Sequence, residues 1–135
     1  MVLDPTRPSP RVLVVDDDAV TREMLREWLK CSGVDATGAA SATDALREVS
    51  DAPPHAVLLA MGLPDIDGYD LCRLLRERPD THRTPIIALT GAAYPADIQR
   101  AREAGCNAVL VKPCSADYLL LELHRVLPSR FRATA

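Results

Sequence analysis

Carboxylates gather near the start of the chain, where Asp16, Asp17 and Asp18 directly follow an apolar run at 12–15. Neighbouring carboxylates repel one another unless a cation is present, and their oxygens suit a hard ion such as Mg²⁺. Asp18 precedes a stretch with helical periodicity, so we interpret it first as a helix N-cap. Asp16 and Asp17 are then the candidate metal ligands, because two acids leaving a buried strand are costly without a function.

Two further polar side chains stand at the ends of later apolar runs, Thr90 and Lys112. A lysine ammonium and a threonine hydroxyl at one point would suit a phosphoryl group, as a cation and a hydrogen-bond donor respectively. Each residue also has an ordinary interpretation, Lys112 as a surface lysine and Thr90 as a turn residue. At the matching place after the run at 56–59 stands Ala60, which offers neither charge nor hydroxyl.

Apolar runs and helical stretches alternate five times, with the runs at 12–15, 34–39, 56–59, 86–89 and 108–111. Four runs are continuous, as in strands buried on both faces, whereas 34–39 is more polar and suits an edge strand. This alternation predicts an α/β fold, a flavodoxin-like (βα)5 doubly wound parallel sheet with strand order 2-1-3-4-5. Another small α/β domain is the alternative.

Capping residues delimit the helices between these runs. We predict helices over 20–30, 42–49, 68–76, from Pro95 to Gly105, and from Ser115 to about Leu127, with Asp18, Ser41, Asp67 and Ser115 as N-caps. The residues that could carry chemistry therefore all lie just beyond the carboxyl ends of predicted strands, where open α/β sheets bind ligands.

Length and composition indicate one ordinary domain of 135 residues. We expect a disordered lead-in at 1–10, a domain at 11–128 and a tail at 129–135. The net charge is −3 with no basic stripe, so nucleic acid is not expected as a direct partner. No apolar stretch approaches the roughly 18 residues of a membrane span, and the N-terminus is not a signal peptide. A cytoplasmic protein without membrane contact is expected.

Four cysteines and three histidines are spread along the chain as Cys31, His55, Cys72, His82, Cys106, Cys114 and His124. They form no CxxC pair and no metal-ligand spacing. We interpret the cysteines as reduced thiols, buried or half-buried, of a cytosolic protein.

Four segments carry a resemblance to a known family, namely 14–18, 58–68, 87–91 and 111–113. In order and spacing they resemble the receiver domains of bacterial response regulators and hybrid histidine kinases, from residue 11 to about 127. The resemblance implies that Asp16, Asp17 and the backbone carbonyl of Gly62 hold Mg²⁺. It implies that Thr90 and Lys112 contact a phosphoryl group, and that the bond between Lys112 and Pro113 is cis.

Three positions depart from the family pattern. Ala60 stands where the family has its phosphoaccepting aspartate, Val109 where many members have Tyr or Phe, and Cys114 where Phe is common. A methyl group cannot attack a phosphohistidine or hold an acyl phosphate, so phosphotransfer should be absent. Asp65 and Asp67 lie too far along the chain to substitute.

Losing a carboxylate at position 60 also removes a metal ligand, so we expect weak Mg²⁺ binding and a metal-free fold at least as stable as one with aspartate. Lys112 is left able to reach Asp16 or Asp17. The alanine fits either a naturally degenerate receiver or an engineered Asp→Ala change, and the intact pocket around it favours engineering or recent loss.

The leading hypothesis is a receiver module of a two-component phosphorelay, stand-alone or excised from a larger protein, that is not itself an enzyme. Its expected partner is a histidine kinase or histidine phosphotransfer protein, docked near the first helix and the loops of the pocket.

The alternative is a phosphorylation-independent interaction module, a pseudo-receiver, acting through its last-helix face or as a homodimer through the 94–127 face. The last helix carries more apolar residues than one buried face requires, although scattered exposed leucines explain it equally well. A flavin carrier is disfavoured, because no Gly-rich phosphate loop occurs and the chain has one Phe and one Trp.

Overall fold

The computed structural model describes residues 6, 8–91 and 94–131. The greater part of the expected lead-in at 1–10 and of the tail at 129–135 lies outside the described residues.

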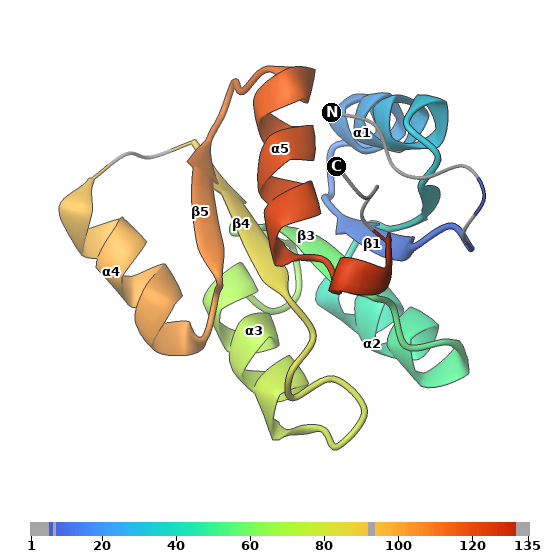
Figure 1. The fold of residues 1–135 in the computed structure, drawn as a ribbon. Coiled ribbons are helices and arrows are strands. Elements are labelled where there is room, and N and C mark those ends of the chain that lie inside the picture. The colour runs from blue at the N-terminus through green and yellow to red at the C-terminus, as the bar shows by residue number, and fades with distance from the viewer. Residues whose placement is uncertain (1–5, 7, 92–93, 132–135) are drawn as a thin grey trace.

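Five parallel strands form one sheet in the order β2-β1-β3-β4-β5 (Figure 1). The strands are β1 (Arg11–Val15), β2 (Asp35–Ala39), β3 (Ala56–Ala60), β4 (Ile86–Thr90) and β5 (Ala108–Val111). The predicted flavodoxin-like order is confirmed, and the polar strand β2 lies at an edge of the sheet as expected.

Helices connect the strands at nearly the predicted places. They are α1 (Ala19–Cys31), α2 (Ala42–Asp51), α3 (Gly68–Glu77), α4 (Pro95–Ala104) and α5 (Ala116–Val126), followed by the 3-10 helix η1 (Ser129–Phe131). Ser41, Asp67 and Ser115 cap their helices by accepting a hydrogen bond from the backbone N–H three residues on. Asp18 holds the N-cap position of α1, but its carboxylate accepts from the Thr21 hydroxyl instead of a backbone N–H.

The two faces of the sheet bury separate apolar cores. On one face, Leu29 of α1 and Leu123 of α5 pack with sheet residues such as Leu58. On the other, α2, α3 and α4 cover residues such as Leu59 and Ile86. A fully buried aliphatic side chain contributes about 1.5–3 kcal/mol relative to an exposed one, so both faces hold the strand ends in register.

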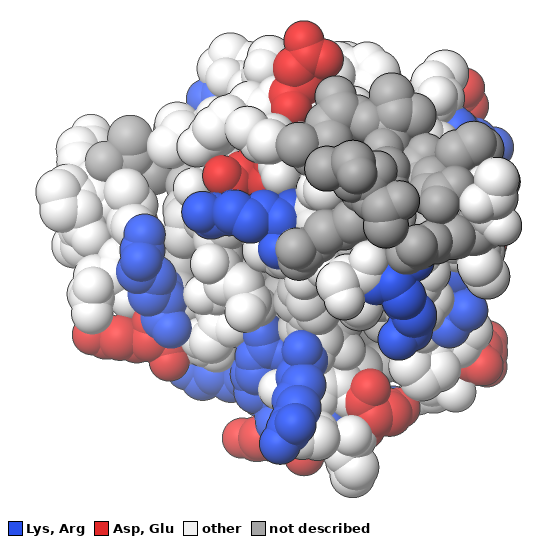
Figure 2. All heavy atoms as spheres, in the orientation of Figure 1, with Lys and Arg blue, Asp and Glu red and all other residues white. Residues whose placement is uncertain are grey.

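Charged side chains of both signs share the face drawn in Figure 2. Basic side chains lie at several places on it, some of them adjoining near the lower middle of the view, with acidic ones beside them, and they form no continuous basic stripe over the part of this face that the structure describes. Within the described ranges, no helix is long and apolar enough to cross a membrane.

Candidate functional site

The adjacent strands β1, β3, β4 and β5 run parallel, so their carboxyl ends meet at one edge of the sheet. That edge presents Asp16 after β1, Ala60 as the last residue of β3, Thr90 as the last residue of β4 and Lys112 after β5. The sequence prediction that these four positions share one face is therefore correct. Gly62 lies two residues beyond Ala60, in the connection to α3.

An ion pair joins the outer two of these positions. Lys112 Nζ lies 2.9 Å from Asp16 Oδ2, although the two residues are 96 positions apart in the chain. Because β3 and β4 lie between β1 and β5, the lysine reaches across the strand ends that carry Ala60 and Thr90. The Asp16 side chain is 2% exposed, so its charge depends on this partner, whereas the Lys112 side chain remains 34% exposed. The expected contact of Lys112 with one of the two acids is confirmed for Asp16.

Further hydrogen bonds fix Asp16 in place. Its Oδ1 accepts from the backbone N–H of Asp18, at 2.9 Å. Its own backbone N–H donates to the carbonyl of Ala39, and its carbonyl accepts from the guanidinium of Arg22. Asp17, in contrast, is exposed. The hydroxyl of Thr21 lowers the pKa of Asp18, which therefore stays ionised.

The acidic pair provides an incomplete set of metal ligands. Among the described residues, no group of three or more Asp, Glu, His or Cys side chains is placed to hold a metal ion. Both carboxylate oxygens of Asp16 are engaged, one by Lys112 and the other by a backbone N–H. A hard cation would therefore have to share Asp16 with the lysine or displace it, and would also use the exposed Asp17 and the Gly62 carbonyl. These residues fit a weak site rather than a strong one.

Ala60 is 3% exposed and closely covered by the start of α3. The backbone N–H of Gly68 donates to the Met61 carbonyl, at 2.8 Å. A Cβ at Gly68 would come within 2.7 Å of the Ala60 carbonyl oxygen and of Met61 Cα, so only glycine fits there. This close approach fixes the connection that contains Gly62. The Ala60 side chain itself has no nucleophilic or metal-binding atom.

The two nearby aspartates are engaged at helix N-termini. Asp65 accepts hydrogen bonds from the backbone N–H groups of Ala42 and Thr43 and from the Thr43 hydroxyl, all at the start of α2. The hydroxyl contributes most, and together these donors hold the pKa of Asp65 far below its usual range. Asp67 caps α3. The cap supplied by Asp65, 23 residues from Ala42, was missed because no local sequence pattern signals it.

The remaining positions of the predicted pocket, Thr90, Val109 and Cys114, lie in less polar surroundings. Thr90 is buried, and its carbonyl accepts from the backbone N–H of Lys112 at 2.7 Å. Val109 packs against the core beneath α3 and α4, and Cys114 packs against the core beneath α1 and α5. The peptide bond between Lys112 and Pro113 is cis, as the resemblance implied.

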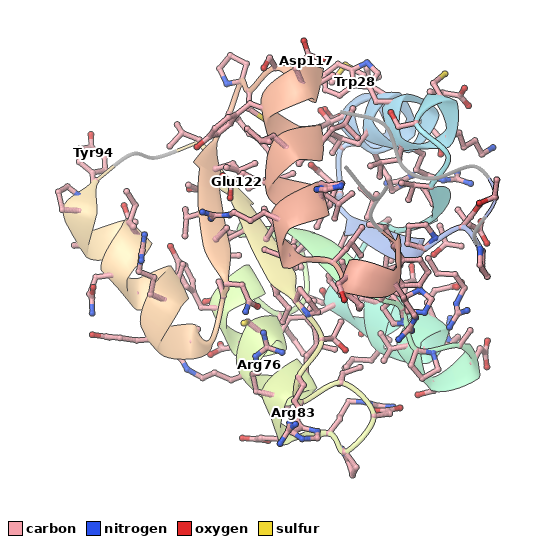
Figure 3. The ribbon with its side chains drawn as sticks, in the orientation of Figure 1. Trp28, Arg76, Arg83, Tyr94, Asp117 and Glu122 are labelled. Carbon is pink, nitrogen blue, oxygen red and sulfur yellow. The ribbon has the colours of Figure 1, made fainter. Side chains whose placement is uncertain are left out.

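A pocket of about 500 Å³ opens beside the ion pair, between α1 and the turn after β5. Its lining is mainly apolar and comprises Thr21, Met24, Leu25, Trp28, Leu89, Lys112, Pro113 and Cys114. Figure 3 places Trp28 on α1, close to the end of α5 that carries Asp117. Val20 and Met24 are 77% and 42% exposed, so α1 presents apolar surface next to the predicted site.

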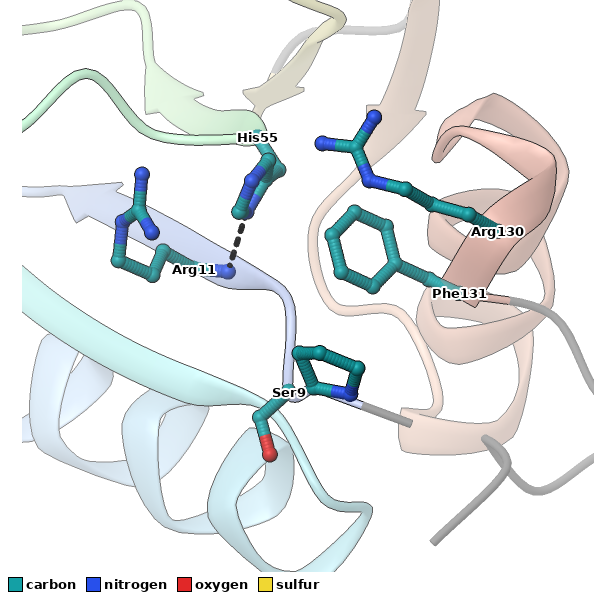
Figure 4. A pocket seen from close by; sticks show the side chains of 6 residues that line it. Ser9, Arg11, His55, Arg130 and Phe131 are labelled. Carbon is teal, nitrogen blue, oxygen red and sulfur yellow. Dashed lines mark hydrogen bonds between the residues drawn. The ribbon is translucent and has the colours of Figure 1, made fainter. Parts of the chain in front are cut away.

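A second pocket, of about 470 Å³, lies at the amino ends of the strands, where β1 begins (Figure 4). It is lined by Pro8, Ser9, Arg11, His55, Arg130 and Phe131. Because it faces the amino ends of the strands, it is separate from the site around Ala60.

The chain belongs to the response regulator receiver domain family, whose model matches residues 12–124. A 14.6 kDa protein of Leptolyngbya boryana is 38% identical over 102 residues, covering 76% of this chain and 78% of that protein. The polar-differentiation response regulator DivK of Brucella ovis is 28% identical over 104 residues, covering 77% of this chain and 85% of DivK.

Solved structures agree with this assignment. A response regulator from Chloroflexus aurantiacus matches with a TM-score of 0.84 and 34% identity, covering 87% of this chain and 97% of that one. The chemotaxis protein CheY4 of Vibrio cholerae matches with a TM-score of 0.85 and 29% identity, covering 88% of this chain and 99% of CheY4. The protein is therefore a receiver domain of the response regulator type.

Proposed function

We propose that this receiver domain takes part in two-component signalling without accepting a phosphoryl group, because Ala60 occupies the phosphoacceptor position. The observation that supports this most is the ion pair between Lys112 and Asp16, which spans the strand end where Ala60 lies. A carboxylate at position 60 would compete for the same ammonium group. With alanine there, the lysine is committed to Asp16. The chain has no nucleophile of its own at this position and is not an enzyme.

Mg²⁺ binds weakly in this proposal. Asp16 and Asp17 supply two carboxylates and Gly62 a carbonyl, and the cation competes with Lys112 for Asp16. Receiver domains in general bind Mg²⁺, and here the ion gains one carboxylate fewer than it would with aspartate at position 60. We expect a dissociation constant well above that of the Ala60→Asp variant.

The partner we infer is a histidine kinase or a histidine phosphotransfer protein in the cytoplasm. The exposed side chains Val20 and Met24 and the pocket containing Trp28 lie beside the Lys112–Asp16 pair, on one side of α1. A partner helix with an apolar stripe would cover this surface and bring its histidine to the carboxyl edge of the sheet. Such docking does not require a phosphoacceptor.

The alternative is a pseudo-receiver that acts through the 94–127 face. Tyr94, Val111, Tyr118 and Leu121 are 71%, 39%, 50% and 45% exposed, so this face also offers apolar surface. Figure 3 shows Tyr94 at the start of α4, away from the body of the sheet. This face would bind another protein or a second copy of the chain without involving the pocket around Ala60.

Substitutions on the two faces distinguish these proposals. Met24→Glu places a charge on α1, and Leu121→Glu is the matched change on α5, since both side chains are 42–45% exposed. We would measure binding of the chain and of both variants to each histidine kinase and histidine phosphotransfer protein of the source organism, by surface plasmon resonance. Autophosphorylated kinases would be used in parallel to follow phosphoryl transfer.

The proposal expects at least one partner whose binding Met24→Glu weakens by about tenfold or more, while Leu121→Glu leaves it unchanged and no phosphoryl group moves to the chain. Binding lost only in Leu121→Glu, or a dimer that this variant dissociates, favours the 94–127 face. Phosphoryl transfer to the unsubstituted chain would contradict the proposal.

A further inference from the structure

We propose that Cys72 and Cys106 form a redox-sensitive pair, which a peroxide converts into an intramolecular disulfide. Cys72 lies on α3 and Cys106 follows α4, 34 residues later, yet their Sγ atoms are 3.5 Å apart. Both residues are buried, at 0% and 7% exposure, and both thiols are free. The pair lies on the α2–α3–α4 side of the sheet and is independent of the function proposed for Ala60.

Arg76 holds the two segments that carry these sulfurs together. It lies one turn after Cys72 on α3, and its guanidinium donates to the carbonyl of Gly105 at 2.8 Å and to Asn107 Oδ1 at 2.8 Å. These acceptors flank Cys106 on both sides. Gly105 has a φ of +110°, and a Cβ there would approach Arg76 to 2.9 Å. Figure 3 shows Arg76 on α3, on the side toward α4 and β5. The loop and the helix are thus fixed with the sulfurs facing each other.

Closing the pair requires only a small movement. A disulfide has an S–S distance of about 2.0 Å, so the sulfurs must approach by roughly 1.5 Å from their present separation of 3.5 Å. Other described cysteines are not so placed: Cys31 is exposed on α1 and Cys114 is half-buried beside Trp28.

The two thiols differ in acidity. The Cys106 S–H donates a hydrogen bond to Cys72 Sγ, and this bond, with the charges of Arg76 and Arg73, lowers the pKa of Cys72. The same hydrogen bond, together with burial, raises the pKa of Cys106. Cys72 therefore ionises first and is the nucleophile, while Cys106 keeps its proton.

The reaction balances with one peroxide. The Cys72 thiolate attacks a peroxide oxygen, an S–O bond forms, the O–O bond breaks, and hydroxide leaves. The Cys106 sulfur then attacks the Cys72 sulfenic acid. An S–S bond forms, the S–O bond breaks, and water leaves with the Cys106 proton. Two thiols are oxidised and one hydrogen peroxide is reduced to two waters, since the hydroxide takes up the proton that Cys72 gave to solvent.

The crosslink would tie α3 to the segment that leads into β5. The closed loop contains β4 and α4, so the disulfide restricts the unfolded chain without requiring a new fold. We expect oxidation to raise Tm by about 5–10 °C, and a dithiol reductant to reverse the change.

The test uses the folded Cys31→Ser/Cys114→Ser variant, which retains only the proposed pair, treated with hydrogen peroxide. Intact mass spectrometry should show the loss of two hydrogen atoms, and neither thiol should be alkylated after unfolding. Adding Cys72→Ala or Cys106→Ala to this background gives matched controls with one thiol, which cannot lose two hydrogens. In the unsubstituted chain, trypsin should release a crosslinked pair of peptides spanning 48–73 and 103–125, and fragmentation should place the bond at Cys106 and not at Cys114, which lies on the same peptide.

The proposal is overturned if the folded variant keeps both thiols at a peroxide dose that crosslinks it in denaturant. Sulfinic acid at either cysteine without a crosslink, or a crosslink to Cys31 or Cys114 in the unsubstituted chain, would overturn it as well.

Discussion

At the scale of single residues, the site is a balance of charges at the ends of four strands. Asp16 carries a nearly fully buried carboxylate, and Lys112 is the cation that compensates it. The methyl group of Ala60 lies on β3, one of the two strands between them, and adds no charge to the cluster. The stability of this edge therefore depends on how many carboxylates share one ammonium group.

Introducing an acid at position 60 should make the metal-free protein less stable. In Ala60→Asp, a second buried carboxylate would share Lys112 with Asp16, and we expect the free energy of unfolding to fall by about 1–2 kcal/mol in EDTA. Millimolar Mg²⁺ should recover this loss, whereas it should change the unsubstituted chain little. Urea unfolding with and without Mg²⁺ measures both effects. A variant clearly more stable than the parent in EDTA would contradict the expected repulsion between the two carboxylates.

Removing the lysine should leave Asp16 buried without a partner. We expect Lys112→Met to lower the free energy of unfolding by about 1–3 kcal/mol, less than for a fully buried pair because Lys112 is partly exposed. Asp16→Asn combined with Lys112→Met should recover much of this loss. The matched control is Arg47→Met, whose pair with Asp44 is exposed on both sides and should contribute less than about 0.5 kcal/mol. If Lys112→Met and Arg47→Met lowered the free energy of unfolding equally, a buried role for the pair of Lys112 with Asp16 would be contradicted.

At the scale of elements, hydrogen bonds from loops fix where helices begin. The local caps at Ser41, Asp67 and Ser115 follow from sequence patterns. Asp65 adds a contact that no local pattern signals, because it joins the connection after β3 to the start of α2. The loop that contains Gly62 is consequently anchored at both of its neighbouring helices.

Removing the Asp65 carboxylate should lower the Tm of the protein, because α2 loses hydrogen bonds at its N-terminus, and the size of this effect should depend on pH. Because its pKa is lowered in the folded state, its contribution is present above the ordinary aspartate value of about 3.9 and declines as pH falls below it. We expect Asp65→Asn to lower Tm by about 2–5 °C at pH 6, and by progressively less below pH 4. The control is Asp51→Asn at the exposed end of α2. A Tm difference that is constant from pH 6 to pH 3 would contradict this account.

His55 connects the amino ends of the strands to the 3-10 helix η1. Its Nδ1 accepts from the backbone N–H of Arg11, and its ring contacts Phe131 of η1 with centroids 4.6 Å apart (Figure 4). Burial, and then the charges of Arg11 and Arg130, lower the pKa of His55. The folded state thus favours the neutral ring, which keeps Nδ1 as an acceptor.

Acid should therefore weaken this contact. The stability due to neutral His55 is present above its ordinary pKa of about 6.5 and is lost as pH falls through the lower value of the folded state. His55→Asn retains an acceptor without a titrating group, so the decline of Tm between pH 7 and 5 should be smaller than in the parent. His82→Asn, at an exposed site, is the control. Identical pH profiles for the parent and His55→Asn would rule out this role.

At the scale of the whole molecule, the features that follow from local sequence patterns could be predicted. Side-chain contacts between segments far apart in the sequence could not. Strand order, edge strand, helix caps and the convergence of Asp16, Thr90 and Lys112 follow from periodicity and from the geometry of parallel sheets. The contact of Phe131 with His55 and that of Cys106 with Cys72 do not, because they join residues far apart in sequence with no shared pattern. Cys31 is exposed, although the cysteines were expected to be buried or half-buried.

The family assignment shows that the chain is a receiver domain, and the central proposal is that Ala60 prevents its phosphorylation. The most direct measurement is incubation with acetyl phosphate and Mg²⁺ followed by intact mass spectrometry, on this chain and on Ala60→Asp. Ala60→Asp combined with Lys112→Met serves as the control that removes the pocket's cation. We expect one added phosphoryl group on Ala60→Asp and none on the chain itself. Failure of both would favour a degenerate interaction module, and a phosphoryl adduct on the unsubstituted chain would contradict the claim.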